Sequence, residues 1–241
     1  RTVTLGLNLF DCASDNFDTF AYRVRSKINR HAKNLVAICN EVGDRYGIPV
    51  VNKRITVSPI GTVCAGYSRD QMVKVCKLLD DCATDAGVDF LGGFGALVEK
   101  GITPGERNLI DALPEALATT NVPFMAGGYL GVGEADAVIS VGVSGPGVVK
   151  KAIDRAVRRR GEQVSITEIA EIIKTTAFKV TKVGQLIGTE VAEKMNLPFG
   201  VADLSLAPTP EVGDSVGEIF QSVGLSSIGA PGSTAVLAML N

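Results

Sequence analysis

The sequence predicts an α/β fold with a mostly parallel sheet, and three observations support this prediction. Strand-like and helix-like hydrophobic patterns alternate along the 241 residues. A hydrophobic content of 46% provides the material for a sizeable core. The strand patterns are apolar on one side and small or polar on the other, unlike strands that helices cover on both faces. We expect a single α/β domain over residues 1–241, with no internal linker.

Two strand patterns flank a long helical pattern at the start of the chain. Residues 2–10 and residues 50–59 alternate between apolar and polar side chains, as strands do. Between them, apolar or small residues recur at helical spacing from Phe17 onward, until Gly47 ends the run. This spacing predicts one helix of about 30 residues.

Capping signals mark the helices that follow. Ser68 suits a helix N-cap and Gly87 suits the position after the helix end, and a short strand pattern follows at residues 88–91. Residues 103–106 place Pro at the first helical position, within the spacing of a capping box. Residues 165–168 repeat that spacing, so each of these two segments predicts a helix start.

The second half continues the alternation after a glycine-rich loop at residues 121–134. Residues 137–153 contain a strand, a glycine turn and a helix start. In the long helix after the second capping box, Gly184 and Gly188 share one face, which predicts the close approach of another helix. The remaining elements are a strand at 199–206, a helix at 212–223, a glycine turn at 229–234 and a last helix.

The polar sides of the strands predict a wide barrel. Branched apolar side chains fill a small eight-stranded barrel, so small polar side chains on the inner face indicate a wider one with room for a loop or a ligand. We expect the following polar side chains to face one shared interior: Thr4, Asn8, Asn52, Arg54, Ser140, Asp203 and Ser205.

The glycine turn between the strand and the helix is a candidate anion-binding site. Backbone N–H groups at a helix N-terminus lack internal partners and lie at the positive end of the helix dipole. Ser144, Gly145 and Gly147 form this turn, and Lys150 and Lys151 lie in the first helical turn, where a bound anion would balance them. A turn that needs glycine only for its backbone geometry is the equally supported alternative.

Composition excludes some classes of function. The net charge of −2 does not favour binding to nucleic acid or to an anionic membrane. There is no signal peptide and no apolar run long enough to span a bilayer, so we expect a cytoplasmic protein. Five cysteines without a CxxC pair indicate free thiols, and one histidine makes a structural zinc site improbable. The sequence identifies no metal site and no cofactor.

Several segments together carry a resemblance to a known family. The segments are RTVTLGLNLFDC, GIPVVNKRITVSPI, VDFLGGFGALVEKG, FMAGGYLGVGEADAVISVGVSGPGVVK, TAFKVTKVGQLIG and DLSLAPTPEVGDSVGEIF. In these segments the chain resembles uncharacterised protein family two hundred and ten of the UPF series, also called the Pfl-like proteins. This resemblance implies a ten-stranded α/β barrel like that of pyruvate formate-lyase and ribonucleotide reductase, and a homodimer.

The chain departs from this family pattern in two ways. Relatives are nearly twice as long and carry an extra stretch between Val122 and Pro123, so we expect the native protein to include residues there and beyond Asn241. Glycyl-radical enzymes of the same fold have a radical glycine near the C-terminus and a catalytic cysteine on a loop inside the barrel. Neither motif matches a position of this chain, so the resemblance implies no radical chemistry.

A few residues are candidates for chemistry. Asn8, Asp11 and Cys12 follow the first strand, at the sheet edge where α/β folds place their sites. Asp11 suits the role of a base or of a cation ligand, and the alternative is that it caps a turn. Cys12 can act as a nucleophile if its pKa is lowered, and the alternative is that it is a packing residue. If Arg54 is buried, it needs an anionic ligand or a carboxylate such as Asp203 as a partner. The alternative is that Arg54 points outward.

Two functions remain open. The first is an enzyme that acts on a small anionic metabolite inside the barrel, with Asp11, Cys12 and Arg54 as catalytic candidates. In this hypothesis Arg54 and the turn from Ser144 to Gly147 hold the anion. The second is a non-catalytic sensor or binding protein that uses the same cavity, and the absence of a recognisable nucleophile–base pair favours it. Asp214 and Ser215 follow Pro210 at a helix start, so we expect them to cap a helix.

Overall fold

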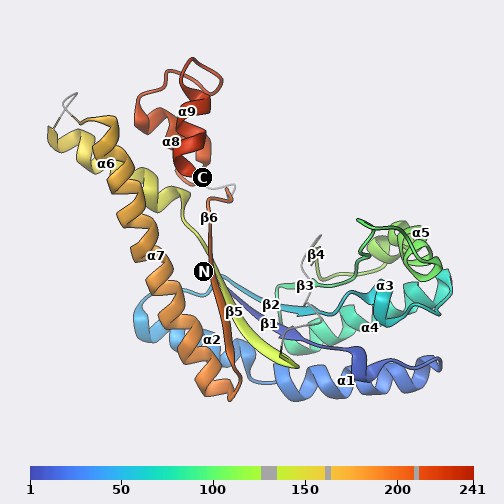
Figure 1. Ribbon diagram of the computed structural model, residues 1–241. Coiled ribbons are helices and arrows are strands. Elements are labelled where there is room, and N and C mark those ends of the chain that lie inside the picture. The colour runs from blue at the N-terminus through green and yellow to red at the C-terminus, as the bar shows by residue number, and fades with distance from the viewer. Residues whose placement is uncertain (126–134, 161–163, 209–211) are drawn as a thin grey trace. The chain divides into compact units, whose positions relative to one another are not determined.

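The computed structural model describes residues 1–125, 135–160, 164–208 and 212–241. The chain divides into two compact units, residues 1–141 with 187–201, and residues 142–186 with 202–241. The elements of the chain, shown in Figure 1, are β1 (Thr2–Leu7), η1 (Phe10–Cys12), α1 (Phe17–Ala32), α2 (Leu35–Tyr46), β2 (Asn52–Val57), α3 (Ile60–Val63), α4 (Arg69–Ala86), β3 (Phe90–Gly92), α5 (Pro104–Ala118), β4 (Phe124–Met125), β5 (Ala137–Ser144), α6 (Pro146–Arg160), α7 (Ile166–Met195), β6 (Phe199–Ser205), α8 (Val216–Val223) and α9 (Ser233–Leu240).

The α/β prediction is confirmed, with a sheet in which the order of the described strands is β4-β3-β2-β1-β5-β6. The first four of these strands are parallel: β1 pairs with β2, β2 with β3, and β3 with β4. β4 is only two residues long and lies within the segment that the sequence predicted to be a loop. The single-domain arrangement and the ten-stranded closure remain predictions.

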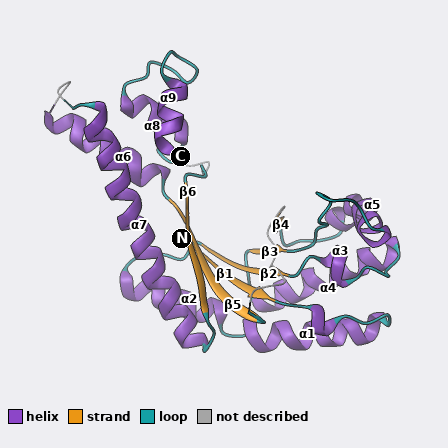
Figure 2. Ribbon diagram, viewed as in Figure 1, coloured by secondary structure: helices purple, strands orange, loops and turns teal. Residues whose placement is uncertain are grey.

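The alternation of apolar and polar side chains is confirmed in the first two strands. Val3, Leu5 and Leu7 of β1 are buried, as are Ile55 and Val57 of β2. Figure 2 shows α1, α2 and α4 together on one side of these strands. Helices on one side, and small or polar side chains on the other, explain why the strands do not read as continuous apolar runs.

The predicted helix of about 30 residues is wrong, because the segment forms two helices. α1 ends at Ala32 and α2 begins at Leu35, with Asn34 between them at φ −109° and ψ 2°. Asparagine readily adopts such non-helical conformations. The apolar spacing runs across the break because Ala32 and Leu35 are both buried. Gly47 ends α2 in the left-handed conformation, at φ 63°, as expected.

The predicted caps are confirmed. Ser68 caps α4 in a capping box with Gln71, and Gly87 follows that helix in the left-handed conformation. Thr103 caps α5 in a second capping box with Pro at the start of the helix. Ser165 and Glu168 form the third box, in which each backbone N–H donates to the other side chain.

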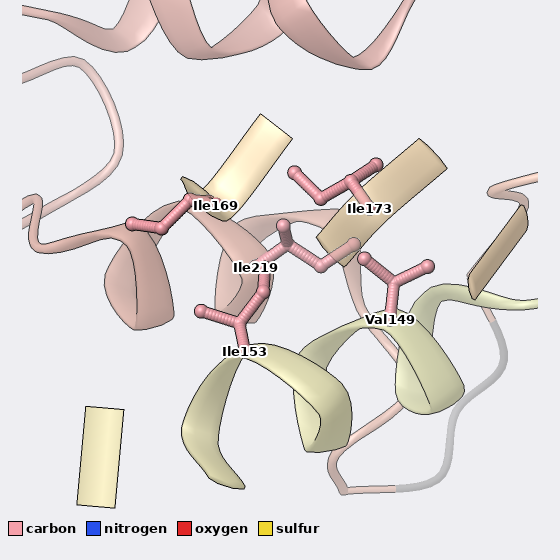
Figure 3. Packing of buried hydrophobic residues seen from close by; sticks show 5 residues of the cluster. All are labelled: Val149, Ile153, Ile169, Ile173 and Ile219. Atoms are coloured by element: carbon pink, nitrogen blue, oxygen red, sulfur yellow. The ribbon is translucent and has the colours of Figure 1, made fainter. Parts of the chain in front are cut away.

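The second unit has a small apolar core of its own. Figure 3 shows its members, which come from α6, α7 and α8, packed toward one another. The five buried residues are Val149, Ile153, Ile169, Ile173 and Ile219. α8 begins only at Val216, four residues later than predicted, with Ser215 as its N-cap.

Gly188 allows a close approach, but not of the helix that the sequence predicted. A Cβ atom at Gly188 would lie 2.5 Å from a carbon of Val141 and 2.5 Å from a carbon of Phe199. Both neighbours are strand residues, on β5 and β6. The glycine therefore lets α7 pack closely against the sheet.

Candidate functional site

The parallel register places Arg54 in the middle of the polar sheet face. Thr4 of β1, Arg54 of β2 and Phe90 of β3 are direct neighbours across the three strands. The guanidinium carbon of Arg54 lies 4.9 Å from the centre of the Phe90 ring, within the range of a cation–π interaction. The ring therefore supports the guanidinium group from one side. The predicted site residue Asn52 occupies the preceding position on this face, beside Thr2.

In the next row of this face, only one of the three strands has a residue other than glycine. Gly6, Thr56 and Gly92 are neighbours in register, so only Thr56 projects a side chain from this row. Thr56 is 9% exposed, and its Oγ1 is buried without a hydrogen-bond partner in the described part of the chain. Thr56 is not among the site residues that were predicted from the sequence.

Arg54 is also incompletely satisfied. Its Nε atom is buried and has no hydrogen-bond partner among the described residues. Burial lowers the pKa of the guanidinium group, and the nearby carboxylate of Asp89 raises it by less. Asp89 itself accepts a hydrogen bond of 2.7 Å from the backbone N–H of Lys53. A desolvated cation with an unused donor is the clearest polar imbalance on this face.

At the carboxyl end of β1, Asn8 organises the turn that leaves the strand. Its Oδ1 accepts a hydrogen bond from the Phe10 backbone N–H at 2.9 Å, and the Ser58 hydroxyl donates to the same oxygen at 3.5 Å. The Leu9 backbone N–H donates to the Ser58 Oγ at 3.1 Å. These bonds give Asn8 a structural role in the turn, and its role as a ligand contact remains a prediction.

A charged cluster lies beside the same turn. Lys27 of α1, only 3% exposed, lies 2.8 Å from a carboxylate oxygen of Asp11 and 2.6 Å from one of Asp136. Burial lowers the pKa of Lys27, but the hydrogen bonds to both aspartates raise it further, so the net shift is upward. Burial raises the pKa of Asp11, but the Lys27 hydrogen bond and charge outweigh this and lower it. At neutral pH the cluster therefore consists of an ammonium group and an ionised Asp11.

Cys12 and His31 lie near this cluster and are poorly placed for catalysis. Burial, together with the charge of Asp11, raises the pKa of the Cys12 thiol to about 11. Its Sγ donates to Asp11 Oδ1 at 3.5 Å, so the thiol form is the stable one. Burial lowers the pKa of His31, whose Nε2 is buried without a partner in the described residues. A nucleophilic cysteine needs a lowered pKa, which this environment does not provide.

The glycine turn before α6 binds the chain's own groups. The Gly147 N–H donates to a carboxylate oxygen of Asp214 at 2.8 Å, and the Gly145 N–H donates to the Ser205 carbonyl at 3.1 Å. The Ser144 hydroxyl donates to the Ala207 carbonyl at 2.6 Å. Asp214 therefore caps α6. An external anion at this turn remains a prediction, and it would compete with that carboxylate.

The first-turn lysine of α6 is also balanced within the chain. Lys150 lies 2.7 Å from a carboxylate oxygen of Asp154, and the Ser222 hydroxyl donates to the other oxygen of Asp154 at 2.6 Å. The prediction that Lys150 needs a bound anion for charge balance is wrong for this reason. Lys151 is exposed to solvent.

The remaining predicted site residues lie on β5 and β6. Ser140 is half-buried, and its hydroxyl accepts a hydrogen bond of 3.4 Å from the Val201 backbone N–H. Asp203 is exposed and Ser205 is half-buried, and both belong to the second unit. The structure therefore brings Asn52, Arg54 and Thr4 together on one face, whereas the shared interior predicted for all seven polar residues remains untested.

Among the described residues, no group of three or more His, Cys, Asp or Glu side chains is arranged to hold a metal ion. None of the described helices combines the length and the apolar character that crossing a bilayer requires.

The family model for "Uncharacterised ACR (DUF711)" matches residues 1–122 and 118–241, so the chain belongs to this family. A UPF0210 protein of Oleidesulfovibrio alaskensis is 58% identical over an alignment that covers all of this chain and 64% of the relative. UPF0210 proteins of Methanocorpusculum labreanum and Ligilactobacillus salivarius are 44% and 43% identical, each with 64% of the relative covered. The family predicted from the sequence segments is thus confirmed. The chain spans about 64% of the length of these curated relatives.

Proposed function

We propose that this protein binds a small anionic molecule on the polar face of β1–β3, with Arg54 as the residue that holds the anionic group. The buried Nε of Arg54, which lacks a partner among the described residues, is the observation that carries this proposal. Burying a cation and leaving one of its donors unpaired costs free energy. A ligand anion at the guanidinium group would remove that cost, and the free energy regained would favour binding of the anion.

The surroundings of Arg54 favour an anion over a neutral ligand. The Phe90 ring lies 4.9 Å from the guanidinium carbon and leaves the edge of the fork as the hydrogen-bonding side. In β1–β3, the positions that share this face with Arg54 carry no other charged side chain. The nearby Asp89 carboxylate offsets part of the Arg54 charge, but among the described residues no carboxylate forms an ion pair with the guanidinium, whereas Asp11 and Asp136 both pair with Lys27.

The test compares Arg54→Gln with Lys53→Gln, a matched control that removes the same charge from the neighbouring, opposite-facing position of β2. The melting temperatures of the parent and both variants are measured with acetate, phosphate and sulfate at constant ionic strength. We expect at least one anion to stabilise the parent and Lys53→Gln but not Arg54→Gln. Equal stabilisation of all three proteins, or of none, would overturn the proposal.

An enzyme that acts on such an anion is the second candidate. The convergence of Asp11, Lys27 and Asp136 beside the carboxyl end of β1 favours it, because catalysis needs several titratable groups close together. In this version the ionised carboxylate of Asp11 acts as the base, although the lowered pKa that Lys27 gives it makes it a weaker base than an ordinary aspartate. Asp11→Asn should then abolish turnover of a bound metabolite without weakening its binding. Binding by the parent without turnover across a metabolite panel would reject the enzyme.

For the complete protein we propose the ten-stranded barrel of the pyruvate formate-lyase type, a homodimer, and a cytoplasmic location. The barrel is supported by strands whose helices lie on one side and whose polar side chains lie on the other, as in a closed sheet with an inner cavity. The five free cysteines suit a reducing compartment. Light scattering on the full-length protein tests the dimer, and a monomer would reject it.

A further inference from the structure

We infer that the ligand of the Arg54 site is a small carboxylate that carries a hydroxyl group next to the carboxyl carbon, rather than a phosphate. This inference rests on the proposed function and narrows it to a chemical class. Two independent features of the site support it: the amount of charge on the face, and the unpaired hydroxyl of Thr56.

The charge of the face matches a monoanion. Arg54 is the single charged side chain among the positions of β1–β3 that share its face, and the Asp89 carboxylate nearby already offsets part of its charge. A carboxylate carries one negative charge and accepts two parallel hydrogen bonds from the guanidinium fork. A phosphate monoester carries about 1.5 to 2 negative charges at neutral pH. It would leave charge uncompensated in a partly desolvated site, at a cost in affinity.

The second feature fixes where the ligand needs a further polar group. Thr56 follows Arg54 on the same face of β2, and residues two apart on a strand face are separated by about 7 Å. The neighbours of Thr56 in register are Gly6 and Gly92, so no other side chain of β1–β3 in that row competes for its hydroxyl. In the inferred complex, the carboxylate of the ligand lies at Arg54, and the group next to its carboxyl carbon extends toward the unpaired Oγ1 of Thr56. A hydroxyl group there can donate to that oxygen or accept from it.

The experiment measures the affinities of acetate, glycolate and inorganic phosphate for the parent protein by calorimetry at constant ionic strength. We expect glycolate to bind about three- to ten-fold more tightly than acetate, which is the factor that one net hydrogen bond gives. Phosphate should bind more weakly than either carboxylate. In Thr56→Val, glycolate and acetate should bind equally, whereas Thr2→Val, which removes a hydroxyl elsewhere on the same face, should keep the preference.

Each outcome separates the inference from the function on which it rests. If phosphate binds best, or if Thr56→Val keeps the glycolate preference, the carboxylate inference is overturned while anion binding stands. If no anion binds the parent, the proposed function itself fails. Thr56→Val should fold at least as stably as the parent, because it removes a buried hydroxyl that has no partner among the described residues.

Discussion

Removing Lys27 should destabilise the protein less than removing its two partners. Lys27 is 3% exposed, whereas the side chains of Asp11 and Asp136 are 63% and 64% exposed. In Lys27→Met, the aspartates lose their partner but remain hydrated, and methionine keeps the apolar contacts and the helix propensity of the lysine stem. In the double variant with alanine at positions 11 and 136, the ammonium group stays buried without an anion.

These two situations differ in free energy by a measurable amount. Two ion pairs with exposed partners contribute at most about 1 kcal/mol each, so Lys27→Met should cost about 1–2 kcal/mol in the free energy of unfolding. Leaving a buried charge unpaired costs about 3–5 kcal/mol, and the exposed rim of this cluster places the double alanine variant near the lower end, about 3 kcal/mol. The order of the two variants is therefore opposite to a ranking by the burial of the substituted side chains, because Lys27 is buried and both aspartates are exposed.

Urea unfolding at pH 7, followed by circular dichroism, gives both free energies. The pH dependence provides a second readout. Because the pKa of Asp11 is lowered in the folded protein, Asp11 contributes to the free energy of unfolding at pH values above its unfolded-state pKa of about 3.9. This contribution is lost as the pH falls through the folded-state pKa. Because the pKa of Lys27 is raised in the folded protein, Lys27 contributes to the free energy of unfolding at pH values below its unfolded-state pKa of about 10.4. This contribution is lost as the pH rises through the folded-state pKa. A double alanine variant as stable as Lys27→Met would refute this reasoning.

Two further predictions concern thiols and a helix contact. Burial raises the pKa of every cysteine thiol, to about 11 or about 12, so Ellman's reagent at pH 7.5 should react slowly with all five in the folded protein and rapidly in urea. Rapid labelling of Cys12 in the folded protein would contradict this prediction and would again make Cys12 a candidate nucleophile. An added Cβ at Gly105 would overlap the Ala65 backbone, whereas one at Gly95 meets nothing within 4 Å. Gly105→Ala should cost about 2–3 kcal/mol and Gly95→Ala less than about 0.5, and similar unfolding midpoints in urea would contradict this.

The elements with local signals could be predicted from the sequence. The capping box at Thr103 needs only residues three positions apart, and the alternation in β1 depends on nearest neighbours. The break between α1 and α2 was missed because both sides of it bury apolar residues at spacings that also suit one continuous helix. β4 was missed because two residues are too few to form a pattern.

The candidate site was only partly predictable, for a different physical reason. Arg54 could be selected from its place in an alternating strand. Lys27 and Asp136 are 109 residues apart, and Gly147 and Asp214 are 67 residues apart, so only the folded chain brings each pair together. A lysine on a helix reads as a solvated charge unless its carboxylate partners are known. Sequence spacing carries no signal of that kind.

The division of the chain into two units has a consequence for how it can be made and cut. The chain passes from one unit to the other within β5, within α7 and within β6, so each unit consists of two separate stretches of sequence. No single proteolytic cut releases either unit intact, and neither corresponds to a contiguous expression fragment. During synthesis, the stretch at 142–186 leaves the ribosome before the stretch at 202–241 with which it forms a unit. The apolar side chains of α6 and the first part of α7 therefore remain without their partners on α8 until residues 202–241 have been synthesised.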